Sequence, residues 1–151
     1  MAARLFVVFT LGPTRYGIAI ESVEEIIPAL PITRLPHSRR ETLGVIEVRG
    51  RVVPVYDLHR RFHAQPPAAT ADARMVLVAL PGGPVALPVD AVEEVASVDA
   101  ADVQSVDLPG DAVPFLSGVV RVRDRLVLWI DPARLVPASV LRRPSKLRKA
   151  A

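Results

Sequence analysis

The histidines are the residues of this sequence that most readily suggest a metal or an acid–base site. His59 and His63 are four residues apart and follow Asp57, so on a helix they would share one face. The same segment also fits a short helix capped by Asp57, with Leu58 and Phe62 turned inward and the basic residues in solvent. We favour this second interpretation, and we predict no metal site.

No other combination of residues predicts catalysis or a bound cofactor. The chain contains no cysteine, which removes thiolate metal ligands and a cysteine nucleophile. No nucleophile, base and orienting group are spaced as in a catalytic triad, and there is no glycine-rich phosphate-binding loop. We therefore predict that the protein is not an enzyme and has no catalytic residues and no cofactor.

The composition is typical of one compact domain. The chain has 151 residues, of which 50% are hydrophobic and 23% charged, so it can bury a core. The absence of cysteine fits a reducing compartment. The first residues lack the pattern of a signal peptide, and no apolar run reaches the ~18 residues of a membrane span. We predict a soluble, cytoplasmic protein without membrane insertion.

Charge is unevenly distributed along the chain, although the net charge is only +3. Residues 138–151 hold five of the 19 basic residues and no acidic residue, which predicts a basic and flexible C-terminal tail. Residues 34–61 hold seven arginines and three acidic residues, whereas residues 75–120 hold seven acidic residues and no basic one. Oppositely charged ends would favour weak head-to-tail self-association.

Short strands are the expected secondary structure. The 15 prolines disfavour long helices, because each one removes a backbone donor and fixes φ. Short β-branched segments bounded by Gly, Pro or Asp predict strands. We expect strands at residues 5–11, 16–20, 44–48, 51–56, 75–80, 85–89, 118–122 and 126–130. We expect short helices near residues 22–27, 58–62 and 91–95.

The pattern also repeats within the chain. Glu25 aligns with Glu94 at an offset of 69 residues, and Arg49 aligns with Arg123 at an offset of 74 residues. Both halves read as hairpin, short acidic helix, loop and hairpin. Such a repeat predicts two small β-barrels, each too small to be stable without packing on the other.

Several segments resemble the CheW family in their order and spacing. They are residues 6–12, 16–20, 23–26, 44–58, 87–90, 92–95 and 118–126. The resemblance implies an all-β fold of two interlocked five-stranded SH3-like barrels, at about 5–65 and 73–137, within one domain at 4–137. Strands can be exchanged between the barrels. It also implies a non-enzymatic adaptor that couples methyl-accepting chemoreceptors to a CheA-type histidine kinase in a signalling array.

The resemblance also implies receptor-binding residues. The receptor-contacting pattern of the family falls on Val23, Glu25, Gly44, Arg49 and Gly50, and the glutamate and arginine of this pattern can pair across the domain. Read without the family, the two charged residues could form an ordinary exposed ion pair. The two glycines fit structural roles, one at a bend or bulge and one at a turn with positive φ.

A proline-flanked loop at residues 29–40 supplies the candidate kinase-binding residues. Its prolines exclude a regular helix or a central strand. Leu30, Ile32 and Leu35 would therefore either plug a barrel or face a partner. We assign these three residues to kinase binding.

Two other functions stay open. A CheW-like protein that binds only the receptor or only the kinase would act as a competitor or as an array component. A basic small-barrel protein could also bind nucleic acid, but it should interleave aromatic and basic residues on one sheet. Only 5% of the residues are aromatic. We therefore predict no specific binding of nucleic acid.

Overall fold

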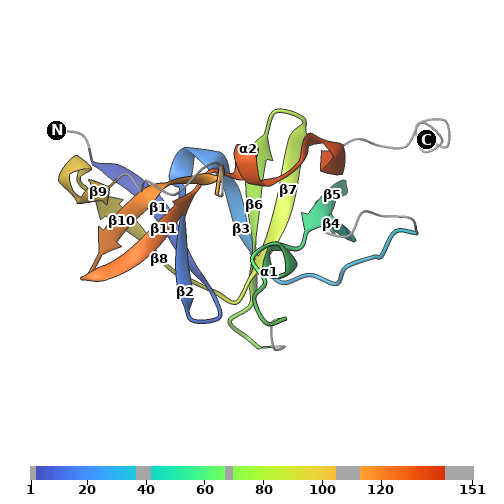
Figure 1. Ribbon diagram of the computed structural model, residues 1–151. Coiled ribbons are helices and arrows are strands. Elements are labelled where there is room, and N and C mark those ends of the chain that lie inside the picture. Colours follow the sequence, from blue (N-terminus) through green and yellow to red (C-terminus); the bar gives the residue numbers. More distant parts are fainter. Residues whose placement is uncertain (1–2, 37–41, 67–69, 105–112, 142–151) are drawn as a thin grey trace.

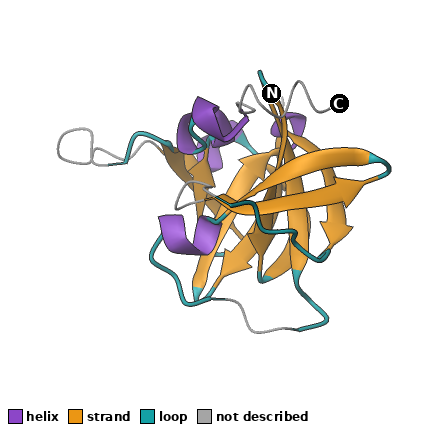
Figure 2. Cartoon of the chain, turned by 90° about the vertical axis from the view of Figure 1, so that its right-hand side faces the viewer, coloured by secondary structure: helices purple, strands orange, loops and turns teal. Residues whose placement is uncertain are grey.

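The computed structural model describes residues 3–36, 42–66, 70–104 and 113–141. Its strands are β1 (Arg4–Leu11), β2 (Thr14–Ala19), β3 (Val23–Pro28), β4 (Thr42–Val48), β5 (Arg51–Tyr56), β6 (Arg74–Leu80), β7 (Gly83–Val89), β8 (Ala91–Val98), β9 (Val103–Gln104), β10 (Leu116–Val122) and β11 (Arg125–Ile130). The helices are η1 (Ile20–Ser22), α1 (Leu58–Arg61), η2 (Ala100–Asp102), α2 (Pro132–Leu135) and η3 (Ala138–Leu141). Figure 2 shows these helices as short coils beside the strands, so the predicted all-β class is confirmed.

The strands form two sheets that lie side by side in Figure 1. The first sheet has the order β8-β1-β2-β11-β10-β9, and the second has the order β3-β6-β7-β5-β4. Each sheet therefore takes strands from both halves of the chain, which is the predicted interlocking. Within the described residues the end strands of a sheet do not pair with each other, so the barrels are not closed.

The two sheets have equivalent strand orders. Under the sequence repeat, β8-β1-β2-β11-β10 of the first sheet corresponds to β3-β6-β7-β5-β4 of the second. In each sheet the hairpin from one half is joined to the other half by an antiparallel pair on one side, β1 with β8 or β6 with β3, and by a parallel pair on the other, β2 with β11 or β7 with β5. A hairpin from one half thus completes the sheet of the other half, which explains why neither half needs a closed core of its own.

The buried side chains form three clusters. One cluster lies inside the first sheet and contains Phe6, Val8, Ala19, Ala96, Val98, Val120 and Val127. A second lies inside the second sheet and contains Ile27, Ile46, Val48, Val53, Val55, Met75, Leu77 and Ala86. The largest cluster combines residues of both sheets, such as Ile18 of β2 and Leu87 of β7. The two sheets therefore stabilise each other by shared burial of apolar surface.

Two of the predicted helices are wrong, because residues 22–27 and 91–95 lie mainly in strands β3 and β8. Both strands contain a bulge. The register of β3 against β6 shifts around Glu24, and that of β8 against β1 shifts around Glu93. A bulge interrupts the two-residue alternation of a strand, so the local sequence loses its strand-like period.

The predicted helix at residues 58–62 is confirmed as α1. Asp57 caps it by accepting a hydrogen bond from the backbone N–H of Arg60 at 3.1 Å, and Leu58 is fully buried. The expectation that the basic residues are solvated is wrong for His59, which is 3% exposed. Its Nε2 lies 2.8 Å from Oδ1 of Asp90, so the imidazole links α1 to the turn after β7.

Packed structure continues to Leu141, beyond the expected start of the tail at Ala138. Val140 and Leu141 of η3 pack against the largest core cluster. The remaining basic tail, residues 142–151, lies outside the described residues. None of the described helices has the length and the apolar run that crossing a bilayer requires.

Candidate functional site

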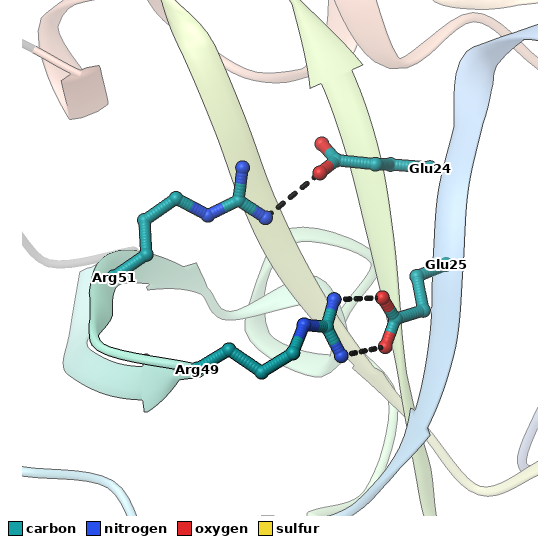
Figure 3. A network of polar contacts seen from close by, with 4 residues as sticks. All are labelled: Glu24, Glu25, Arg49 and Arg51. Atoms are coloured by element: carbon teal, nitrogen blue, oxygen red, sulfur yellow. Dashed lines mark hydrogen bonds and ion pairs between the residues drawn. The ribbon is translucent and has the colours of Figure 1, made fainter.

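Glu25 of β3 and Arg49 of the turn between β4 and β5 form a two-point ion pair (Figure 3). The Nη1 group of Arg49 donates to Oε2 of Glu25 at 2.9 Å, and the Nη2 group donates to Oε1. Two parallel contacts of this kind fix the plane of the guanidinium as well as its position. The pair therefore presents an oriented cation on the surface.

A second ion pair lies beside the first. Arg51 donates from Nη2 to Oε1 of Glu24 at 2.7 Å. Consecutive residues of a regular strand point to opposite faces, but the bulge at Glu24 lets both glutamates reach the same hairpin. We call Glu24, Glu25, Arg49 and Arg51 the first ionic cluster. It connects the two ends of the second sheet, the edge strand β3 and the β4–β5 hairpin, which do not pair with each other through the backbone among the described residues.

The electrostatics of the first ionic cluster hold both partners in their charged forms. The hydrogen bond from Arg49 lowers the pKa of the Glu25 carboxyl, and the same contact raises the pKa of the Arg49 guanidinium. The Arg49 side chain is 67% exposed, and that of Glu25 is 29% exposed. A pair this open to water is poorly placed to stabilise the fold but well placed to contact a partner.

The structure gives the other three predicted receptor-binding residues different positions. Gly50 lies beside Arg49 in the turn, with a φ of 79°, and a Cβ there would meet nothing within 4 Å. Val23 is half-buried and packs against the core shared by the two sheets. Gly44 is covered by the backbone of Thr33, so it supports the loop rather than the surface.

The proline-flanked loop contains both kinds of apolar residue that the sequence suggested. Leu30 and Ile32 are half-buried and pack against the core of the second sheet. Thr33 and Val45 exchange two backbone hydrogen bonds of 2.8 Å, which attach the loop to β4. Leu35 is 38% exposed. Leu30 and Ile32 therefore act as plugs, whereas Leu35 is available to a partner.

The sequence reasoning missed an equivalent ionic group on the first sheet. Arg123, in the turn between β10 and β11, lies with Nε 3.2 Å from Oε2 of Glu94 on β8. Arg15 donates from Nε to Oε1 of Glu93 at 2.8 Å. Applying the offsets of 69 and 74 residues to Glu25 and Arg49 leads directly to Glu94 and Arg123. The repeat was therefore the signal that could have found this group.

These ion pairs also reduce the charge separation that the sequence predicted. Glu93 and Glu94 belong to the acidic stretch, but both pair with arginines from outside it or from beyond its end. Arg49 and Arg51 of the arginine-rich stretch pair with glutamates that precede it. Pairing across the sheets brings these opposite charges together, so the polarity of the molecule is weaker than that of the sequence.

The described aromatic rings mostly pack against one another. The Tyr16 ring stacks on that of Phe62 at 4.8 Å, and the Phe62 ring contacts Phe115 at 5.2 Å. Trp129 and the fully buried Phe6 form a T-shaped ring pair with their centroids 5.2 Å apart.

In the described part of the chain, no group of three His, Cys, Asp or Glu residues is placed to hold a metal ion.

The sequence and the fold are similar to those of known proteins along almost the whole chain. The family model of the CheW-like domain matches residues 5–140. A probable chemotaxis protein CheW of Rhizobium etli is 31% identical over 130 residues, which cover 85% of this chain and 84% of the relative. The protein FrzA of Myxococcus xanthus is 34% identical over 118 residues, which cover 77% of this chain and 73% of the relative. The crystal structure of the scaffolding protein TtCheW from Thermoanaerobacter tengcongensis matches with a TM-score of 0.80 at 28% identity, covering 93% of this chain and 92% of that one.

Proposed function

The chain belongs to the CheW-like domain family, and on this premise we propose that it is a non-enzymatic adaptor that couples chemoreceptors to a CheA-type histidine kinase. The adaptor binds the cytoplasmic tips of methyl-accepting chemoreceptors on one surface and the kinase on another. It works in the cytoplasm, where its partners hold it at membrane-associated receptor arrays. The names of the relatives, chemotaxis and scaffolding proteins, support this proposal.

The observation that carries the receptor-binding part is the two-point contact between Glu25 and Arg49. Glu25 occupies two N–H donors of Arg49 and leaves the others of its five for an acceptor on the receptor. Because Glu25 already fixes the guanidinium, little side-chain entropy is lost when the receptor binds. The proposed receptor-binding residues are Val23, Glu25, Gly44, Arg49 and Gly50. Among them, Gly44 and Gly50 act by shaping the backbone.

The kinase-binding part rests on the proline-flanked loop. Leu35 is the apolar residue of this loop that contacts the kinase, while Leu30 and Ile32 anchor the loop to the second sheet. An exposed leucine on an anchored loop is a suitable anchor for a partner, because its position is already fixed. The loop and the Arg49 turn are both attached to the second sheet. The receptor and the kinase can therefore bind at the same time only if the surfaces that they contact on this sheet do not overlap.

Weak head-to-tail association of two copies also belongs to this proposal. Arg34 and the acidic residues Asp99 and Asp102 are exposed. The segments that hold them, the proline-flanked loop before β4 and the η2 segment before β9, lie toward opposite ends of the molecule in Figure 1. Exposed charges attract only over about a Debye length, ~8 Å at 0.15 M salt. Sedimentation velocity should therefore detect dimers at low ionic strength and monomers at physiological salt. Monomers under both conditions would contradict head-to-tail association.

Receptor binding is tested by calorimetric titration with a purified cytoplasmic receptor fragment. Arg49→Glu should weaken binding by about tenfold or more, because it places a like charge beside Glu25. Arg123→Glu is the matched control: both arginines have a φ of 50° and pair with the equivalent glutamate. It should leave receptor affinity within about twofold of the wild type.

The outcomes separate the proposal from its alternatives. An unchanged affinity for Arg49→Glu would show that the receptor binds elsewhere. An equal loss for both variants would indicate a general charge effect. A parallel titration with the kinase regulatory domain then tests the second partner. Binding of only one partner would make the protein a competitor or a single-partner component of the array.

A further inference from the structure

We propose that the equivalent ionic group on the first sheet is a second protein-binding site, which takes an acidic segment of a partner. We call it the second ionic cluster, and its members are Arg15, Glu93, Glu94, Arg123 and Arg125. The proposal is independent of receptor binding at the first ionic cluster. It depends instead on a difference between the two clusters.

The second ionic cluster surrounds a cavity of about 320 Å³. The apolar part of its lining comes from Val8 of β1, Val122 of β10 and Val127 of β11. The five charged residues of the cluster supply the rest of the lining. A recess with an apolar part and a charged rim can receive an apolar side chain while the rim binds a neighbouring charge.

Arg15 changes the pairing within the second ionic cluster. In the first ionic cluster each glutamate pairs with a different arginine of the β4–β5 hairpin. Arg49 pairs with Glu25, and Arg51 pairs with Glu24. In the second, Glu93 takes the position of Glu24, but Arg15 donates to both of its oxygens, at 2.8 and 3.4 Å. The residue that corresponds to Arg15 in the first cluster is Pro84, which has no charge to contribute.

Arg125 is therefore left over. It corresponds to Arg51, yet within the described part of the chain it has no carboxylate within 4.0 Å. It is exposed and lines the cavity. Three arginines thus meet two glutamates, and both glutamates are already neutralised by Arg15 and Arg123. The site has one cation to spare, which makes it complementary to a partner carboxylate.

The apolar part of the lining lies next to Arg125. Val122 pairs with Arg125 across the β10–β11 hairpin, and Val127 lies two residues after Arg125 on β11, so all three side chains share the face that lines the cavity. A recess that combines apolar and charged lining suits a segment of a protein better than a small anion. The fitting partner segment carries a glutamate or aspartate for Arg125 and an apolar residue beside it.

The site can be tested with a defined probe. We would titrate the ¹⁵N-labelled full chain with a synthetic helical peptide rich in Glu and Leu, and with the same peptide in which every Glu is replaced by Gln. Chemical shifts should change on β8, β10 and β11 around the cavity with the Glu peptide only. Changes confined to the first ionic cluster, equal changes with both peptides, or no changes would each overturn the proposal.

Three variants make the test specific. Arg125→Gln should weaken binding of the Glu peptide by about tenfold, the usual effect of losing one good charged contact. Arg121→Gln removes the same charge from an exposed residue of β10 that lies opposite Leu126, on the face away from Arg125. It should leave binding unchanged. If the two variants weakened binding equally, the peptide would be recognising the net charge of the protein rather than this site.

Arg15→Gln tests the pairing argument without touching Arg125. Once Arg15 is neutral, Glu93 becomes free to pair with Arg125, as Glu24 pairs with Arg51. The peptide must then compete with Glu93, so its affinity should fall by about threefold or more. Unchanged or tighter binding would overturn the pairing argument. Receptor affinity should be unaffected by Arg125→Gln and Arg15→Gln, so a failure here is distinguishable from a failure of the receptor site.

Discussion

Gly44 lies directly against the backbone of Thr33, so closely that a Cβ at Gly44 would fall 2.2 Å from the Thr33 carbonyl oxygen. The φ of Gly44 is 147°, which side-chain-bearing residues rarely adopt. The adjacent Val45 exchanges two hydrogen bonds with Thr33. This close approach fixes the proline-flanked loop on β4. Gly44 can therefore affect partner binding without contacting a partner.

Gly44→Ala should destabilise the protein by about 2–4 kcal/mol, because the new Cβ meets backbone atoms that cannot turn aside. Gly50→Ala is the control, since Gly50 also has a positive φ but open space around it. It should cost only about 1–2 kcal/mol. Urea denaturation would measure both. Equal losses would show that backbone conformation, rather than contact with Thr33, makes glycine necessary.

Exchanging the charges of Glu25 and Arg49 should restore part of the receptor affinity that Arg49→Glu removes. In the double variant Glu25→Arg, Arg49→Glu, the ion pair can form again with reversed polarity. Double-variant titration against the same receptor fragment gives the coupling between the two residues. Strictly additive losses would mean that the two residues do not act as a pair.

The pairing of Glu25 with Arg49 should be visible in a pH titration. The hydrogen bond from Arg49 lowers the pKa of Glu25 in the folded state, so the unfolded chain binds a proton at higher pH than the folded chain. The contribution of the pair to stability is thus complete above the unfolded value, about 4.3, and is lost as the pH falls through the folded value.

NMR titration of the Glu25 carboxyl carbon would check this directly. In the wild type its pKa should lie below the ordinary range of glutamate, and in Arg49→Gln it should move up toward that range. Receptor binding by the wild type should accordingly stay constant between about pH 7 and 5. A Glu25 titration that does not respond to Arg49→Gln would contradict the contact.

Ile32→Asp and Leu35→Asp should have different effects, although the residues are three positions apart. Ile32 packs against the core of the second sheet, so an aspartate there should lower the melting temperature by several degrees. Leu35 is exposed, so its replacement should leave the melting temperature within about 2 °C and weaken binding of the kinase regulatory domain. A folded Leu35→Asp variant with normal kinase affinity would move the kinase site away from this loop.

The sequence by itself determined the local elements and their repetition. Short β-branched segments bounded by turn residues predicted eight of the strands, and Asp57 before Leu58 predicted the cap of α1, because these features depend on near neighbours in the chain. The repeat predicted two equivalent units. The pairing of Glu25 with Arg49 came from resemblance to a family, not from spacing.

Only the tertiary structure decided which distant segments meet. The β1–β2 hairpin joins β8 and β11, and this exchange places Arg15 beside Glu93. The bulges at Glu24 and Glu93 arise from strand register, which is set across the sheet rather than along one strand. Contacts across each sheet also pair charges that lie far apart in the sequence, such as Arg49 with Glu25. It is non-local pairing, invisible in any short window of residues, that gave Gly44 its support role and left Arg125 without a carboxylate among the described residues.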